Sequence, residues 1–175
     1  RLFILWSSPF PGNAIFLAFL CSSYSLGEDV YYKSFEDTKE QTLPYFSLSD
    51  KELDKTYRQG KWSVRQILCH LADLDTILYD RTRRVMAEPK QVTMAFDQDE
   101  WQASDYNNFP LKISRSIFSN DREGIIFLAN KFYESHGHKE FIHRRTGLRT
   151  LRQEFDIVAE HNTSHLAQIK TALNT

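Results

Sequence analysis

The stretch KWSVRQILCHLADL, residues 61–74, carries the clearest helix start in the chain. Ser63 can act as the N-cap, and Gln66, three residues later, can complete a capping box. Trp62 and Ile67 occupy the two positions of a hydrophobic staple across that cap. These signals predict a helix that begins directly after Ser63.

The same segment continues without Gly or Pro to about Glu88, where Pro89 is expected to end the helix. Its apolar positions fall on one face at helical spacing: Ile67, Leu71, Leu74 and Leu78. The pattern predicts a long amphipathic helix that buries one side.

Three further segments show helical spacing of apolar residues: 29–42, 111–133 and 150 to the last residues. For the segment 111–133 the expected inner positions are Ile113, Ile117, Ile125, Leu128 and Phe132. No strand-like alternation persists anywhere. We therefore predict an all-α fold, a four-helix bundle. Residues 89–110 and 134–149 are longer than tight links require, so at least one of them is expected to cross the end of the bundle or build over a site.

Composition narrows the possible functions. The 175 residues include 22 Lys and Arg against 23 Asp and Glu, a formal net charge of −1, so no overall basic field favours nucleic acid as a partner. Two cysteines, Cys21 and Cys69, form no C-x-x-C motif, which favours a reducing compartment.

Residues 1–25 are treated separately from a bundle domain spanning residues 26–175. They form an apolar extension whose run Ala14–Cys21 is too short to span a membrane. A basic Arg1, this apolar run and small residues after it also fit the remnant of a signal sequence. A cytoplasmic protein is the favoured expectation, and an exported one is the alternative.

The stretch EHNTSHLAQI, residues 160–169, places His161 and His165 four residues apart on an otherwise apolar helix face. Such a spacing brings two imidazoles to the same side of a helix, about 5–6 Å apart at Cβ. His70 lies on the inner face of the helix after Ser63, so three histidines meet if those two helices face each other. A divalent metal would then satisfy three buried nitrogens at once, whereas each orphan nitrogen costs about 1–3 kcal/mol.

The histidine pair and His70 each have a competing explanation when they are considered separately. Random placement of six histidines among 175 residues gives roughly 0.2 pairs at this spacing. A single histidine on an apolar face, such as His70 alone, is more often a hydrogen-bonded core residue. The other three histidines, His136, His138 and His143, lie in a polar stretch and are expected on the surface.

The stretch LSDKELDKTYRQGKWSVRQILCHLAD, residues 48–73, together with the late H-x-x-x-H, resembles the DinB/YfiT-like superfamily. The family's G-K-W-S lead-in corresponds to residues 60–63, and its single and paired histidines correspond to His70, His161 and His165. The stretch FDQDEWQASDYNNFPL, residues 96–111, resembles a loop of one branch of the family. The resemblance runs from about residue 29 to the C-terminus and implies a four-helix bundle with a long crossover.

The resemblance implies a divalent metal held by three histidines, zinc first, with nickel or iron as alternatives. It also implies a small-molecule substrate and either of two activities: transfer of a low-molecular-weight thiol, which would be a co-substrate, or metal-dependent hydrolysis. The alternative is a non-catalytic helical protein that binds metal and acts through a partner. An exposed apolar helix face would also allow a homodimer.

Other candidate residues lie near the predicted site. The loop 95–109 offers acids that could supply a base (Asp97, Asp99, Glu100) and side chains that could shape a pocket (Trp101, Tyr106, Asn107, Asn108). For each of them a solvated loop, with Trp101 closing the end of the bundle, is the competing interpretation. Asp73 and Glu160 could accept hydrogen bonds from ligand imidazoles. Arg81 could bind a substrate carboxylate or form a surface ion pair, and Cys69 is expected to point away from the metal.

Overall fold

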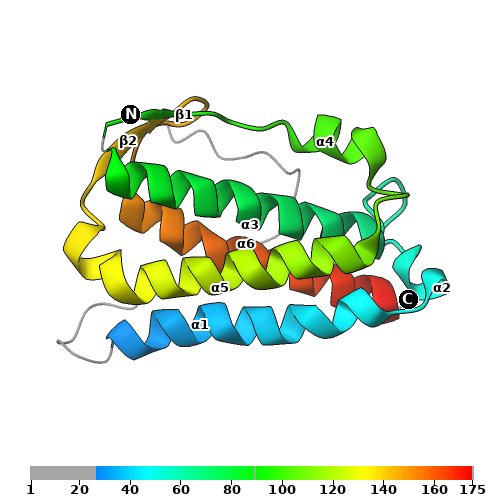
Figure 1. Cartoon of the computed structure of the whole chain (residues 1–175). Coiled ribbons are helices and arrows are strands. Elements are labelled where there is room, and N and C mark those ends of the chain that lie inside the picture. The colour runs from blue at the N-terminus through cyan, green and yellow to red at the C-terminus, as the bar shows by residue number, and fades with distance from the viewer. Residues whose placement is uncertain (1–26, 89, 175) are drawn as a thin grey trace, which may run out of the picture.

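The computed structural model describes residues 27–88 and 90–174, so residues 1–25 with their predicted extension or signal remnant lie outside it. Four long helices run side by side as a bundle (Figure 1): α1 (Gly27–Thr42), α3 (Val64–Ala87), α5 (Leu111–His136) and α6 (Leu151–Asn174). α3 packs against α5 and α6, and α1 packs against the same two helices from the other side. The predicted all-α bundle is confirmed, with helix bounds within three residues of those expected.

The start of α3 follows the predicted capping box. Ser63 Oγ accepts a hydrogen bond from the Gln66 backbone N–H at 3.3 Å, and Gln66 Oε1 accepts one from the Ser63 N–H at 2.9 Å. The apolar face predicted for this helix is buried throughout, from Ile67 to Leu78. These contacts fix where α3 begins and which side faces the core.

Short elements connect the long helices. A 3-10 helix η1 (Leu43–Ser47) and α2 (Asp50–Leu53) join α1 to α3, and α4 (Gln98–Asp105) lies in the long connection between α3 and α5. In Figure 1 this connection passes over the side of the bundle formed by α3 and α6. It is the long crossover that the family resemblance implies, and it runs along the side of the bundle rather than across its end.

The expectation of a chain without strands is wrong. The two long connections meet in a three-stranded sheet of order β1-β2-β3, formed by β1 (Val92–Thr93), β2 (Glu140–His143) and β3 (Gly147–Thr150). β1 is parallel to β2, with Val92 opposite Ile142, and β2 is antiparallel to β3. Strands of two to four residues are too short to show a detectable alternation. Gly147, with φ of +80°, begins β3 in a conformation that favours glycine.

The inner face predicted for the first half of α5 is also wrong. Ile113 is 42% exposed and Ile117 is only half-buried, while Ser114, Phe118 and Arg122 are buried. Two of these buried side chains are polar, so a search for apolar periodicity passes over them. Ile125 and Leu128, further along, are buried as predicted.

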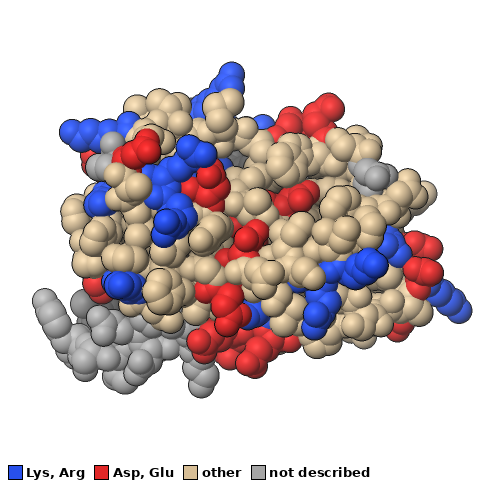
Figure 2. Space-filling view, in the orientation of Figure 1, with Lys and Arg blue, Asp and Glu red and all other residues tan. Residues whose placement is uncertain are grey.

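The surface carries both signs of charge. Figure 2 shows Lys and Arg side chains at both ends of the bundle with Asp and Glu side chains among and between them, so neither sign covers the visible face. None of the helices in the described ranges combines the length and apolar character that crossing a bilayer requires.

Candidate metal centre

Three imidazole rings from two helices converge at the interface of α3 and α6. His70 comes from α3, and His161 and His165 come from successive turns of α6. One nitrogen of each ring lies within 4.8 Å of the others. His70 Nε2 and His161 Nε2 are 3.4 Å apart. The structure therefore brings together all three residues that the sequence singled out as metal ligands.

The spacing of these nitrogens fits a metal ion. Two imidazole nitrogens bound to tetrahedral zinc at about 2.0–2.1 Å lie about 3.3 Å from each other. The His70–His161 pair already has this separation at 3.4 Å. The ring centroid of His165 lies 5.0 Å from that of His70 and 4.4 Å from that of His161.

The rings are neutral, as metal ligands must be. Burial lowers the pKa of His70 well below its usual value, and the neighbouring His165 and His161 rings lower it further. Burial and His165 also lower the pKa of His161 to about 3. Burial lowers the pKa of His165 to about 4, while the hydrogen bond that His165 donates to Gln168 raises it. Lone pairs are therefore available near pH 7.

Hydrogen bonds orient one of the rings. His165 Nδ1 lies 2.8 Å from Gln168 Oε1. Because an amide oxygen only accepts hydrogen bonds, His165 Nδ1 carries the proton and Nε2 keeps its lone pair. For His70, Nδ1 is buried and has no hydrogen-bond partner among the described residues. Nε2 is the nitrogen that faces His161, so a cation shared with His161 would not satisfy this Nδ1.

Aromatic side chains line the histidine cluster. The Trp62 ring meets the His70 ring edge-on at 4.9 Å and stacks on the His165 ring at 6.4 Å. Phe96, from the connection between β1 and α4, stacks on His70 at 6.2 Å. Trp101 packs edge-on against Phe96 and is 42% exposed. These rings make an apolar wall that limits the access of water to the cluster.

The acidic residues proposed for the site have other contacts. Asp73 accepts a 2.5 Å hydrogen bond from the Tyr106 hydroxyl, and Glu160 is exposed. Asp97 accepts hydrogen bonds from two backbone N–H groups as the N-cap of α4. Gln66 donates to Asn107 at 3.1 Å, which ties the end of the crossover to the start of α3. Among the described residues, no carboxylate shares the three-histidine cluster.

Arg81 has neither of the two roles expected from the sequence, which were binding a substrate carboxylate and forming a surface ion pair. It is buried, forms an ion pair with the fully buried Glu154, and donates to the Met94 carbonyl at 3.2 Å. Glu154 therefore occupies the position that a substrate carboxylate would need. His143, expected in a surface loop, is half-buried in β2.

Cys69 points away from the cluster, as expected. Its sulfur lies 3.5 Å from Ser114 Oγ and 3.8 Å from the Tyr106 carbonyl. Burial raises the pKa of this thiol, so it stays protonated. It is a poor candidate for a fourth ligand.

Sequence reasoning missed Gln168 and Phe96. Gln168 is three residues after His165 on the same helix, so its proximity could have been deduced from helical spacing alone. The position of Phe96 depends on how the crossover folds over α3, which no local pattern reveals.

The chain belongs to the DinB superfamily, whose family model matches residues 34–169. It is 33% identical over 128 residues to a protein of Oceanobacillus iheyensis named "Putative metal-dependent hydrolase OB0413", covering 73% of this chain and 74% of that protein. A second protein of the same organism, "Putative metal-dependent hydrolase OB0782", is 32% identical over 123 residues, covering 70% of this chain and 71% of that protein.

The fold matches a solved structure. The structure of YfiT from Bacillus subtilis, described as "a probable metal-dependent hydrolase with an unusual four-helix bundle topology", aligns with a TM-score of 0.76 at 22% sequence identity. The alignment covers 89% of this chain and 91% of that one. The likeness extends over the whole bundle.

Proposed function

We propose that the chain binds one divalent cation through His70, His161 and His165 and is a metal-dependent enzyme acting on a small molecule. The observation that carries the proposal is the convergence of three neutral imidazoles within 4.8 Å at the α3–α6 interface. Imidazole donors suit zinc, nickel, copper and iron. Zinc is the metal we expect first, with nickel or iron as alternatives.

A catalytic role is favoured over a structural one because the described residues supply three ligands and no fourth. Structural zinc sites are closed by four protein ligands, while catalytic sites keep positions open. Cys69 and Asp73, which lie on the same helix as His70, are held by Ser114 and Tyr106. Substrate would reach the remaining positions.

When bound, a divalent cation supplies Lewis acidity that lowers the pKa of a small acid that reaches it. The chain's own residues set the conditions for this chemistry. Gln168 holds the His165 ring by its Nδ1 proton, and Trp62 and Phe96 cover the cluster with apolar surface. An apolar wall excludes bulk water and strengthens electrostatic interactions within the site.

Hydrolysis is the activity favoured by the names of the relatives, which describe metal-dependent hydrolases. One structural observation favours thiol transfer as the second candidate. No carboxylate among the described residues shares the cluster to act as a general base. A thiol, with a pKa near 8.5, needs far less help to ionise than water does.

The metal content of the purified protein tests the proposed metal binding. Protein purified without chelator should contain about one divalent metal per chain, and His161→Ala should lose it. His138→Ala is the matched control, because His138 is exposed and outside the cluster. Equal metal content in wild type and His161→Ala would contradict the proposal.

Turnover of model substrates tests the proposed enzyme activity. Metal-loaded protein should be assayed with activated esters, and separately with low-molecular-weight thiols plus electrophiles. Activity that is lost in His70→Ala and kept in His138→Ala would support an enzyme. The assay in which turnover is seen would identify the reaction as hydrolysis or as thiol transfer. Metal binding without turnover in either assay would instead favour a non-catalytic protein that acts through a partner.

The homodimer and the cytoplasmic location stay predictions. Two exposed apolar side chains of α5, Ile113 and Phe127, would suit self-association. Light scattering measures the mass in solution directly, and a monomer mass would contradict the homodimer.

A further inference from the structure

A layer of buried polar side chains crosses the bundle at its middle. The apolar core is divided into two clusters: on α5 one begins at Ile125 and the other includes Phe118. Arg122 lies between them and is 1% exposed. A fully buried guanidinium is rare and requires partners.

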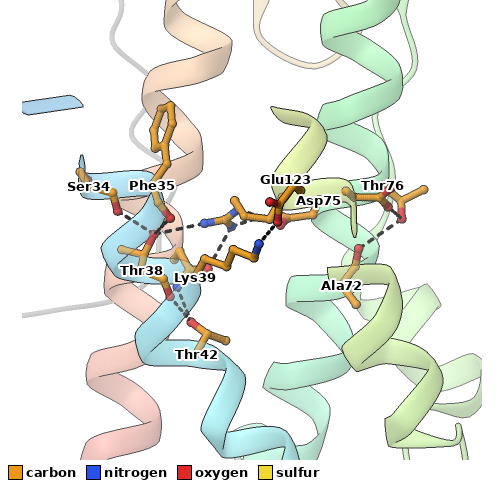
Figure 3. A network of polar contacts seen from close by, with 12 residues as sticks. Ser34, Phe35, Thr38, Lys39, Thr42, Ala72, Asp75, Thr76 and Glu123 are labelled. Atoms are coloured by element: carbon orange, nitrogen blue, oxygen red, sulfur yellow. Dashed lines mark hydrogen bonds and ion pairs between the residues drawn. The ribbon is translucent and has the colours of Figure 1, made fainter. Parts of the chain in front are cut away.

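Arg122 bonds to each of the other three long helices. Its Nε and Nη2 donate to the two carboxylate oxygens of Asp75 on α3, both at 2.8 Å. Nη1 donates to Thr38 Oγ1 on α1 at 3.1 Å, and Nη2 donates to Asn162 Oδ1 on α6 at 3.0 Å. Figure 3 shows Thr38, Thr42 and Asp75 pointing into this network from α1 and α3.

The network continues from α6 back to α1. Asn162 Nδ2 donates to Thr42 Oγ1 at 2.9 Å, and the Thr42 hydroxyl donates to the Thr38 carbonyl at 2.6 Å. The Thr38 hydroxyl donates in turn to the Ser34 carbonyl at 2.9 Å. Each interaction has a defined direction and fails if one helix slides along its neighbour.

Net stability does not account for such a network. Removing two charges from water is expensive, and well-packed apolar side chains often replace a buried ion pair without loss of stability. Apolar contacts, however, are non-directional and set the register of two helices loosely. Buried polar residues are best known for fixing register.

The network ties together the two helices that carry the histidines. Asn162 directly follows His161 and precedes His165 by three residues on α6. Asp75 follows His70 by five residues on α3, about 7.5 Å along the helix axis. Arg122 bonds to Asp75 and Asn162 at once, so its guanidinium links α3 to α6 beside the cluster. Metal–ligand distances are expected to fall within about 0.2 Å of their usual values, so the relative position of the two helices matters.

We propose that Arg122 is a positioning residue that, through Asp75 and Asn162, sets the register of α6 against α3 and thereby the geometry of the three histidines. The inference rests on the proposed metal binding. It predicts that metal affinity and folding stability respond separately to changes in the network.

The test compares apolar replacement of the network with a matched core change. Arg122→Met combined with Asp75→Leu removes both buried charges. Ile125→Val, one turn further along α5, trims an equally buried side chain and leaves the polar layer intact. Each protein is measured for urea unfolding, for Co²⁺ affinity by competition with a chelator, and for the visible spectrum of bound Co²⁺.

We expect the double variant to unfold cooperatively, to bind Co²⁺ at least about tenfold more weakly, and to show an altered spectrum, by analogy with lost outer-shell partners. Ile125→Val should keep the affinity and spectrum of wild type even though its stability falls. A folded double variant with wild-type affinity and spectrum overturns the inference.

If the double variant does not fold, a milder variant tests the inference. Thr42→Val removes the acceptor for Asn162 Nδ2 with little change of shape, and loss of one hydrogen bond should weaken Co²⁺ binding about threefold or more. Unchanged binding in Thr42→Val would then overturn the inference. Wild-type protein that takes up no Co²⁺ would instead overturn the proposed function, and this inference with it.

Discussion

Acidification of the metal-free protein should destabilise it through the histidine cluster. The pKa of His161 is lowered to about 3 and that of His165 to about 4, from 6.5, chiefly by burial. Between about pH 4 and 6.5 the unfolded chain therefore binds more protons than the folded one, so stability falls as the pH falls. The contribution of the two histidines to stability is fully present above pH 6.5. It is lost as the pH falls towards their folded-state pKa values of about 4 and about 3.

The size of the effect follows from these values. Between pH 7 and pH 5 each ring that protonates only on unfolding contributes a loss of about 2 kcal/mol, or about 3–4 kcal/mol for the pair. His70, whose pKa is also lowered, acts in the same direction. The loss is a large part of the about 5–15 kcal/mol that stabilises a typical domain.

Urea unfolding in the presence of a chelator at pH 7, 6 and 5 measures the loss. Carboxylates titrate over part of the same range, so the comparison is with His161→Leu/His165→Leu, in which about 3–4 kcal/mol of the pH dependence should disappear. His138→Ala, an exposed position, should keep the wild-type dependence. A double variant with the same pH dependence as wild type would refute the reasoning that both rings are neutral in the folded protein.

Three further predictions concern substitutions of residues other than the three histidines. Ser63→Ala should lower the free energy of unfolding by about 1 kcal/mol in urea denaturation, because it removes the N-cap of α3, and an unchanged midpoint would contradict this. Arg81→Met should lower the free energy of unfolding by less than the about 3–5 kcal/mol of a lone buried charge, because the buried Glu154 carboxylate keeps Arg149 at 3.3 Å, and a still smaller loss in Arg81→Met/Glu154→Leu would confirm the cause. Gln168→Leu should weaken metal binding about 10–100-fold in a chelator competition, since His165 Nδ1 loses its acceptor, and wild-type affinity would show that the contact is dispensable.

Local signals in the sequence predicted the helices well. The capping box of Ser63 and Gln66 forms as the spacing implies, and the four long helices lie where apolar periodicity places them. The convergence of His70 with His161 and His165 followed from helical spacing together with the resemblance to the DinB/YfiT-like superfamily. These features depend on residues a few positions apart, for which periodicity is a direct physical signal.

The features that were missed depend on contacts between distant residues. β1 and β2 pair residues 92 and 142, and neither strand is long enough to be recognised alone. Arg122 and Arg81 are buried because Asp75 and Glu154 on other helices neutralise them, which is not visible in their own segments. Burial of charge is decided by tertiary partners rather than by local pattern.

The central claim, that three imidazoles from α3 and α6 hold one metal ion, is tested most directly by anomalous diffraction from a crystal of the metal-loaded protein. The account predicts one anomalous peak about 2.0–2.2 Å from a nitrogen of each of His70, His161 and His165, with no fourth protein ligand from the described residues. Diffraction data without a peak between these rings, or with the ion bound elsewhere, would contradict it.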